Sequence, residues 1–289
     1  IDPCMLFLIG LLKMSSKTPL VSVVMPAYNA EKYISEAIES ILNQTFKDFE
    51  FIIIDDGSTD RTWEIIQEYA KKDERIVPLK NEKNLKTTVT LNKGVDLSKG
   101  KYLVRMDADD WSYPDRIQEQ FEFMEKNPEI AVSGGSIEVC DENLMIKNKR
   151  KYPLSDNEIR KKIFRYNPFA HPSIILRKNK VLEVGKYDEK LPLTQDYDLY
   201  FRLGNVGKLA NLSNVLLKLR THTDSSSLSQ SKLQERIALY VRIKATMEYG
   251  YKMEVSDKIY TFLQWFSTFF LSGNLKFRIF NLVRSSRRL

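Results

Sequence analysis

The chain is poor in cysteine, glycine and proline, and it has no long apolar run. Two cysteines in 289 residues, Cys4 and Cys140, exclude a disulfide-built scaffold and indicate a reducing compartment. Eleven glycines and ten prolines exclude a collagen-like chain. A hydrophobic fraction of 43% excludes global disorder, so the sequence predicts a folded protein with a buried core.

No apolar stretch reaches the roughly 18 to 20 residues that cross a bilayer. The best candidates are residues 5–12 and the interrupted stretch 262–271, so we expect no ordinary membrane-spanning helix. Residues 1–17 start without Met, and they lack the basic start and the cleavage site of a signal peptide. We interpret them as a leader outside the folded domain, of the kind that a vector encodes.

The formal net charge of +7 is concentrated at the C-terminal end. Residues 258–289 hold six Lys and Arg and no Asp or Glu, which leaves the rest of the chain nearly neutral. Phe262, Phe266 and Phe269 recur there at helical spacing, and a basic aromatic helix can lie in a membrane interface. The alternative is a helix packed on the domain with a solvated basic end. Nucleic acid is not an expected partner, because no recognition motif accompanies the charge.

Apolar runs alternate with amphipathic patterns over residues 20–139, as in βα units. The patterns predict strands at 21–25, 49–54, 76–79 and 102–106, and helices at 31–44, 61–71, 87–97 and from Pro114 onward. A strand at 130–140 broken by Gly134-Gly135, a loosely patterned polar stretch at 141–157, and a strand-like segment at 171–176 follow. We therefore predict an α/β fold: a Rossmann-like, mainly parallel sheet flanked by helices, with a second half covering one mouth.

Polar residues follow three of the predicted strands. They are Pro26-Ala27-Tyr28-Asn29, Asp55-Asp56-Gly57-Ser58 and Asp107-Ala108-Asp109-Asp110. Ligands bind beyond the carboxyl ends of strands in open α/β sheets, so these segments should meet at one edge. There a Tyr and an Asp can hold a planar base, and paired carboxylates suit Mg²⁺ or Mn²⁺ bound to phosphates. Taken singly, a strand-end Asp is more often a cap or turn residue, and Tyr28 a packing residue.

Other phosphate-binding machinery is missing. Gly100-Lys101 is followed by Tyr102 rather than Ser or Thr, so there is no P-loop, and no G-x-G-x-x-G follows the first strand. Trp111 stands where Asp-x-Asp phosphatases usually have a small residue, which weakens a phosphoryl-transfer reading. A glycoside hydrolase also uses two carboxylates but needs neither a base pocket nor adjacent metal carboxylates.

Five segments resemble family-2 glycosyltransferases of the GT-A fold: VSVVMPAYNA (21–30), IIIDDGSTD (52–60), LNKG (91–94), VRMDADD (104–110) and PDR (114–116). They occur in the family's order and spacing. The resemblance continues more weakly through HPS (171–173), TQD (194–196) and RTH (220–222). It implies a GT-A domain at 18–230, with a nucleotide-binding half at 18–116 and an acceptor-side half at 117–230. A helical basic-aromatic extension would follow at 231–289.

The resemblance implies a role for each matching residue. The donor would be held by Pro26, Ala27, Tyr28, Asp56, Asn84, Lys86, Asn92, Asp107 and Ala108. Asp107 and Asp109 would form the D-x-D motif that holds a divalent metal, Mn²⁺ or Mg²⁺. Asp196 matches the catalytic base, although Gln195 replaces the Glu that usually precedes it.

Two histidines stay open at this stage. His222 falls where some relatives supply an extra metal or phosphate ligand, but a His beside the Ser-rich stretch 225–227 is also simply solvated. His171 would contact the acceptor or be a satisfied structural histidine.

The implied function is a single in-line displacement with inversion, from a nucleotide sugar to a saccharide hydroxyl. We expect a UDP-sugar donor and a hexosyl or N-acetylhexosaminyl transfer. Because the chain lacks the Q-x-x-R-W motif of processive synthases, it should add one or a few sugars per encounter. A lipid-linked acceptor in bacterial surface polysaccharide synthesis would place the enzyme in the cytoplasm, peripheral at the inner membrane face. The alternative is a non-catalytic nucleotide-sugar-binding scaffold on the same fold.

Overall fold

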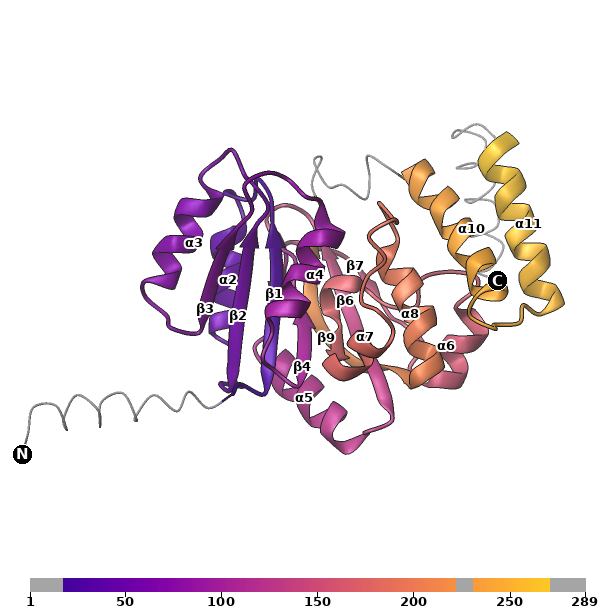
Figure 1. Ribbon diagram of the computed structural model, residues 1–289, viewed down its shortest axis with the longest axis horizontal. Helices are drawn as coiled ribbons and strands as arrows, with labels where there is room; N and C mark the ends of the chain where they lie inside the picture. Colours follow the sequence, from indigo (N-terminus) through magenta and orange to yellow (C-terminus); the bar gives the residue numbers. More distant parts are fainter. Residues whose placement is uncertain (1–17, 222–230, 271–289) are drawn as a thin grey trace, which may run out of the picture.

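The computed structural model describes residues 18–221 and 231–270. Its centre is one mixed sheet with the strand order β3-β2-β1-β4-β8-β6-β9-β5, and β7 pairs with β6 outside this path. The strands are β1 Val21–Ala27, β2 Phe49–Asp55, β3 Ile76–Lys80, β4 Tyr102–Arg105, β5 Trp111–Ser112, β6 Ile130–Cys140, β7 Ile146–Arg150, β8 Ile175–Arg177 and β9 Lys208–Arg220. Helices cover both faces of the sheet (Figure 1).

The helices are α2 Ile34–Leu42, α3 Thr62–Ala70, α4 Thr87–Leu97, α5 Arg116–Lys126, α6 Asp156–Lys162, α7 Lys178–Glu183, α8 Gln195–Val206, α10 Ser231–Met247 and α11 Val255–Phe270, with a short 3₁₀ helix, η1, at His171–Ser173. The predicted alternation of strands and helices up to β6 is confirmed. No helix in the described part of the chain is long and apolar enough to cross a membrane.

The nucleotide-binding half of the sheet is parallel. β1 pairs with β2 and with β4, and β2 pairs with β3, all in parallel register. Every residue of β2 is buried, which explains its unbroken apolar sequence, because parallel strands are covered on both faces. The parallel register brings the carboxyl ends of β1, β2 and β4 to one edge. The second half adds the antiparallel pairs β4·β8, β6·β8 and β5·β9.

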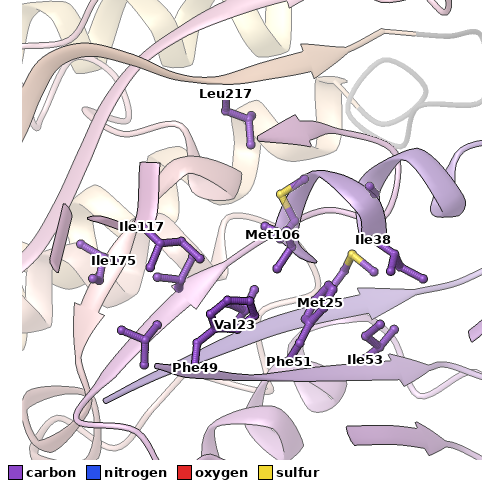
Figure 2. Packing of buried hydrophobic residues seen from close by; sticks show 14 of the residues in the cluster. Val23, Met25, Ile38, Phe49, Phe51, Ile53, Met106, Ile117, Ile175 and Leu217 are labelled. Carbon is purple, nitrogen blue, oxygen red and sulfur yellow. The ribbon is translucent and has the colours of Figure 1, made fainter. Parts of the chain in front are cut away.

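Side chains alternate between two hydrophobic clusters, one on each face of the sheet. On one face Val23 and Phe51 pack with Ile38 of α2 and Ile117 of α5 (Figure 2). On the other face Val24 and Leu103 of the strands pack with residues of α4, α8 and α10. The sheet thus joins the two halves through one continuous set of strands.

Two predicted features of the second half are wrong. β6 runs through Gly134-Gly135 without a break. A Cβ at Gly134 would lie 2.5 Å from Asn211 Oδ1 of β9, and a Cβ at Gly135 would lie 2.4 Å from Leu216 Cδ1 of β9. Glycine therefore lets β9 approach, at the cost of register shifts around Gly135 and Ser136. The segment predicted as a strand at 171–176 begins as the 3₁₀ helix η1, and only Ile175–Arg177 pairs in the sheet.

The C-terminal extension is helical over its described part. α10 packs against α8 and α11, and Figure 1 shows the two final helices side by side at the end of the molecule remote from β3. Ile259, Phe262 and Leu263 on α11 are 56%, 60% and 58% exposed. Residues 271–289, with five of the six tail cations, lie outside the described residues.

Candidate active site

One cleft collects most of the predicted site. It lies beyond the carboxyl ends of β1, β2 and β4, faces the N-terminus of α8, and holds about 1240 Å³ of empty space including its open mouth. Its lining includes Pro26, Ala27, Tyr28, Asp56, Asp107, His171 and Asp196, which come from both halves of the sequence. The structure therefore brings these seven predicted residues together.

Asp56 and Tyr28 form one end of the cleft. The Asp56 N–H donates to Ala27 O at 2.8 Å, which ties the ends of β1 and β2 together. Asp56 is buried, and its Oδ1 accepts hydrogen bonds from Asn81 Nδ2 at 2.7 Å and from the Leu85 N–H at 2.9 Å. Tyr28 is 49% exposed, so its ring is open to stack on a planar group. This arrangement has the chemistry of a nucleobase pocket.

A glycine sets the loop beside this pocket. Gly57 has φ +75°, and a Cβ there would lie 2.6 Å from Lys83 C and 2.8 Å from Asn84 N. Asn84 Oδ1 accepts the Lys86 N–H at 3.0 Å, and Lys86 itself has φ +74°. Asn84 and Lys86 lie next in the chain to Leu85, which binds Asp56, but neither is among the residues that line the cleft.

Two residues predicted to bind the donor, Asn92 and Ala108, are not among the residues that line the cleft. The Asn92 side chain donates to Tyr187 O at 3.0 Å and to Glu189 Oε1 at 2.8 Å, and it accepts the Tyr187 N–H at 3.0 Å. Its amide is thus committed to holding the 187–189 segment against α4, outside the cleft lining. Ala108 is buried in the hydrophobic cluster rather than in the cleft.

Three carboxylates follow β4. Asp107, Asp109 and Asp110 each place an oxygen within 4.8 Å of the others. Asp110 was not predicted as a ligand. Its Oδ1 accepts the Arg220 N–H at 2.9 Å, while its buried Oδ2 has no hydrogen-bond partner among the described residues. Burial and the neighbouring charges of Asp109 and Asp107 raise the pKa of Asp110 well above its usual value.

This carboxylate group fits a divalent cation. All its donors are hard oxygens, the ligand type of Mg²⁺ and Mn²⁺, and the orphaned Asp110 oxygen leaves one buried acceptor to be satisfied. Arg220 anchors the loop, since its Nε donates to Asp109 O at 2.7 Å and its Nη2 to Glu36 Oε2 at 2.6 Å. His222, the other predicted ligand, lies outside the described residues.

Asp196 lines the same cleft from the first turn of α8. Its Oδ2 accepts a hydrogen bond from Asn167 Nδ2 at 2.7 Å, and Asn167 Oδ1 in turn accepts the Phe169 N–H at 3.2 Å. Burial raises the pKa of Asp196, while Asn167 and the Arg105 charge act in the opposite direction. Thr194, the N-cap residue of α8 two positions before Asp196, has φ +58°, a strained conformation common at functional sites. A carboxylate with a raised pKa in a cleft is a candidate general base.

His171 lies in the same cleft and is held by a tyrosine. Its Nε2 lies 2.9 Å from the Tyr187 hydroxyl, and the two rings meet edge to face at 5.6 Å. Burial, reinforced by the Arg105 charge, lowers the pKa of His171 well below its usual value, which favours the neutral imidazole. This placement fits both predicted roles of His171, acceptor contact and structural histidine, because the ring has a protein partner and also lines the cleft.

A second cavity adjoins Asp196 on the side of the C-terminal helices. It is lined by Asn167, Thr194, Asp196, Tyr197, Gln234, Glu235, Ala238, Arg242 and Gln264, of which the first cleft shares Asn167, Thr194, Asp196 and Gln234. Arg242 joins three elements here, because it donates to the Tyr197 hydroxyl, to Gln264 Oε1 and to Arg165 O. The polar lining suits a hydroxyl-rich molecule.

An α/β domain of this topology, with an aspartate cluster after a central strand and a further carboxylate in the same cleft, has the architecture of GT-A-type glycosyltransferases. The model of "Glycosyl transferase family 2" matches residues 22–185, more than half of the chain. The chain therefore belongs to glycosyltransferase family 2.

Curated relatives agree with this assignment. An uncharacterized glycosyltransferase of Methanocaldococcus jannaschii is 42% identical over 226 residues, covering 77% of this chain and 78% of the relative. The amylovoran biosynthesis glycosyltransferase AmsE of Erwinia amylovora is 34% identical over 209 residues, covering 70% of this chain and 77% of AmsE.

Solved structures share the fold. TarS of S. aureus has a TM-score of 0.62 at 20% identity, covering 88% of this chain and 44% of TarS, so the chain spans less than half of that protein. The mannosyltransferase PcManGT of Pyrobaculum calidifontis, in complex with GDP-Man and Mn²⁺, has a TM-score of 0.62 at 13% identity, covering 89% of this chain and 71% of PcManGT.

Proposed function

We propose that this glycosyltransferase is an inverting, metal-dependent enzyme that transfers a hexosyl or N-acetylhexosaminyl group from a UDP-sugar to a saccharide hydroxyl. The observation that carries the proposal is the position of Asp196. This carboxylate, whose pKa burial raises, faces the same cleft as the base pocket and Asp107. A bound sugar would thus have a base on one side and the diphosphate site on the other.

In this mechanism Asp196 removes the proton of the acceptor hydroxyl as that oxygen attacks the anomeric carbon. A positioned base of this kind contributes about 10² to 10⁴ in rate. Asn167 orients the Asp196 carboxylate by a 2.7 Å hydrogen bond. Asp107, Asp109 and Asp110 would hold a divalent cation, which supplies positive charge to offset the departing nucleoside diphosphate.

Solved relatives of the fold support the choice of donor. TarS structures are described in complex with UDP and with UDP-GlcNAc, and the mannosyltransferase with GDP-Man and Mn²⁺. Calorimetric titration with UDP, GDP, dTDP and CMP, each with and without Mn²⁺, tests both nucleotide and metal. We expect UDP to bind tightly only with Mn²⁺. Failure of all four to bind folded protein would refute the donor site.

Replacement of Asp196 by Asn tests catalysis. We expect transfer to fall by about 10² or more while Mn²⁺-dependent UDP binding is retained, because the base does not bind the nucleotide. Asp96→Asn, at an exposed ion pair with Lys186, is the matched control and should change neither. The rival function, a non-catalytic nucleotide-sugar-binding scaffold, predicts no turnover in the parent protein and therefore no loss.

The acceptor is proposed to be a lipid-linked saccharide at the inner face of the cytoplasmic membrane. The cavity beside Asp196 reaches Gln264 of α11, whose exposed Phe262 and Leu263 suit a lipid interface. The relative AmsE, named for amylovoran biosynthesis, supports a role in surface polysaccharide assembly. The C-terminal basic tail would add attraction to anionic lipids.

A further inference from the structure

Five arginines are buried in the described part of the chain: Arg105, Arg116, Arg177, Arg220 and Arg242. In four of them every guanidinium nitrogen contacts a protein acceptor. The three nitrogens of Arg177, for example, donate to Ile130 O, to the Tyr102 hydroxyl and to the carbonyls of Met124 and Asn127. Arg116, Arg220 and Arg242 are satisfied in the same way.

Arg105 is the exception. It is 6% exposed, and its guanidinium contacts one acceptor group among the described residues, the Asp107 carboxylate. Its Nε has no hydrogen-bond partner in that part of the chain. A buried guanidinium carries five N–H donors, and leaving them unpaired is costly, so an incompletely paired one is evidence of a ligand site. Of the five buried arginines, Arg105 is the one that lines the active-site cleft.

The position of Arg105 identifies the part of the donor that it faces. Asp107, at the diphosphate side, is its ion-pair partner. His171 and Asp196 line the same cleft as Arg105, and the Arg105 charge acts to lower the pKa of both groups. In an in-line displacement the transferred sugar occupies the space between the leaving diphosphate and the attacking oxygen. Arg105 lines the cleft that holds both Asp107 and Asp196, and the sugar ring would lie in that cleft.

We propose that Arg105 is a donor-specificity residue, whose guanidinium binds the hydroxyl groups of the transferred sugar. The planar guanidinium presents paired N–H donors in a fixed arrangement, which matches two neighbouring oxygens of a sugar ring. Asp107 already balances the positive charge of the Arg105 guanidinium. The N–H groups that do not contact Asp107 can therefore donate to neutral sugar hydroxyls, and no second anion is needed. This assignment rests on the proposed function, because it needs a nucleotide sugar in the cleft.

Arg105→Met tests the assignment by calorimetry with UDP, UDP-glucose and UDP-N-acetylglucosamine in the presence of Mn²⁺. We expect the best-bound UDP-sugar to lose about 10- to 100-fold in affinity, the usual effect of hydrogen bonds to a charged group, while UDP affinity stays unchanged. Arg105→Lys keeps the charge but not the paired donors, so it should recover only part of the loss. It also carries the test if the Met variant does not fold. Arg61→Met, at an exposed position outside the cleft lining, is the matched control.

The outcomes separate this inference from the proposed function. If the parent protein binds no UDP with Mn²⁺, the proposed donor is wrong. If it binds GDP instead, the Arg105 variants are tested with GDP and GDP-mannose in place of the uridine ligands. An equal loss of UDP and UDP-sugar affinity in Arg105→Met would assign Arg105 to the diphosphate or metal site and overturn its role in reading the sugar. No loss for any UDP-sugar would overturn it as well.

Discussion

At the scale of single residues, the chemical state of Asp196 depends on its neighbours. Burial makes its carboxylate harder to form, whereas the hydrogen bond from Asn167 stabilises the charged form. The Asn167 amide is fixed because its own oxygen accepts the Phe169 N–H. Asn167 is therefore a positioning residue for the proposed base.

Replacing Asn167 by Ala should raise the pKa of Asp196 further, since a hydrogen bond that favours the carboxylate is lost. The base works only when deprotonated, so the acidic limb of the kcat/KM profile should move to higher pH. At pH 7 we expect kcat/KM to fall about tenfold, with UDP affinity unchanged. The pH–rate profile with a UDP-sugar donor measures this. An unmoved acidic limb would show that Asn167 serves folding alone.

Removal of the metal carboxylates should act on nucleotide binding. Asp109→Ala takes one of three clustered oxygens away, and the remaining two should bind a cation more weakly. We expect Mn²⁺-dependent UDP binding to be lost, as it would be in the parent protein after EDTA treatment, while the melting temperature changes little. UDP binding that persists in both cases would contradict a metal-bridged donor.

At the scale of elements, one glycine sets the spacing of two loops. Gly57 combines a positive φ with close contact to the backbone of Lys83 and Asn84. Gly185 also has a positive φ, +82°, but its Cβ position is open. Substitutions at Gly57 and at Gly185 therefore separate the energetic cost of backbone strain from the cost of steric contact.

Gly57→Ala should destabilise folding and weaken UDP binding, because the displaced loop carries the Leu85 N–H that binds Asp56. Gly185→Ala should cost about 1 kcal/mol of unfolding free energy from strain alone and leave UDP affinity unchanged. Urea unfolding and calorimetry measure the two effects. Equal stability losses would show that the contact with the 83–84 backbone is easily relieved.

α8 and α10 are joined by a buried anion. Asp198 is fully buried and accepts from Arg202 Nε at 2.8 Å and from the Tyr249 hydroxyl at 2.7 Å, and Lys244 Nζ lies 3.3 Å away. Asp198→Asn leaves Arg202 without its carboxylate partner, whereas Lys244 keeps Asp188 at 2.8 Å, and we expect a loss of about 3 kcal/mol in urea unfolding. Asp96→Asn removes an exposed partner and should cost about 0 to 1 kcal/mol. Similar small losses in both would show that solvent screens the buried group.

At the scale of the whole molecule, the exposed apolar face of α11 lies on the helix that also lines the cavity beside Asp196. If this face docks on lipid, Phe262→Gln with Leu263→Gln should weaken sedimentation with phosphatidylglycerol-containing vesicles at least about tenfold, since each buried side chain contributes about 1.5 to 3 kcal/mol. UDP affinity should stay the same. Leu97→Gln, an exposed apolar residue of α4, is the control. Unchanged vesicle binding would refute docking through α11.

The sequence predicts the parallel half of the sheet well because each strand and helix there has a recognisable pattern within its own short segment. The continuous apolar run of β2 and the helical spacing of α2 are properties of short segments. Motif residues at the ends of those strands, such as Asp56 and Asp107, share a cleft because parallel strands end at one edge. β7 was missed because all five of its residues are exposed, so they leave no apolar pattern.

The sequence by itself determined the family, the strand-end carboxylates and the candidate base, because these depend on residue type and spacing. Only the tertiary structure decided which polar residues are satisfied by protein and which are left for a ligand. The Asn92 amide is fully paired with the 187–189 segment, whereas Arg105 of β4 has an Nε that none of the described residues satisfies. Hydrogen-bond partners lie tens of residues away in sequence, and only folding brings them into contact.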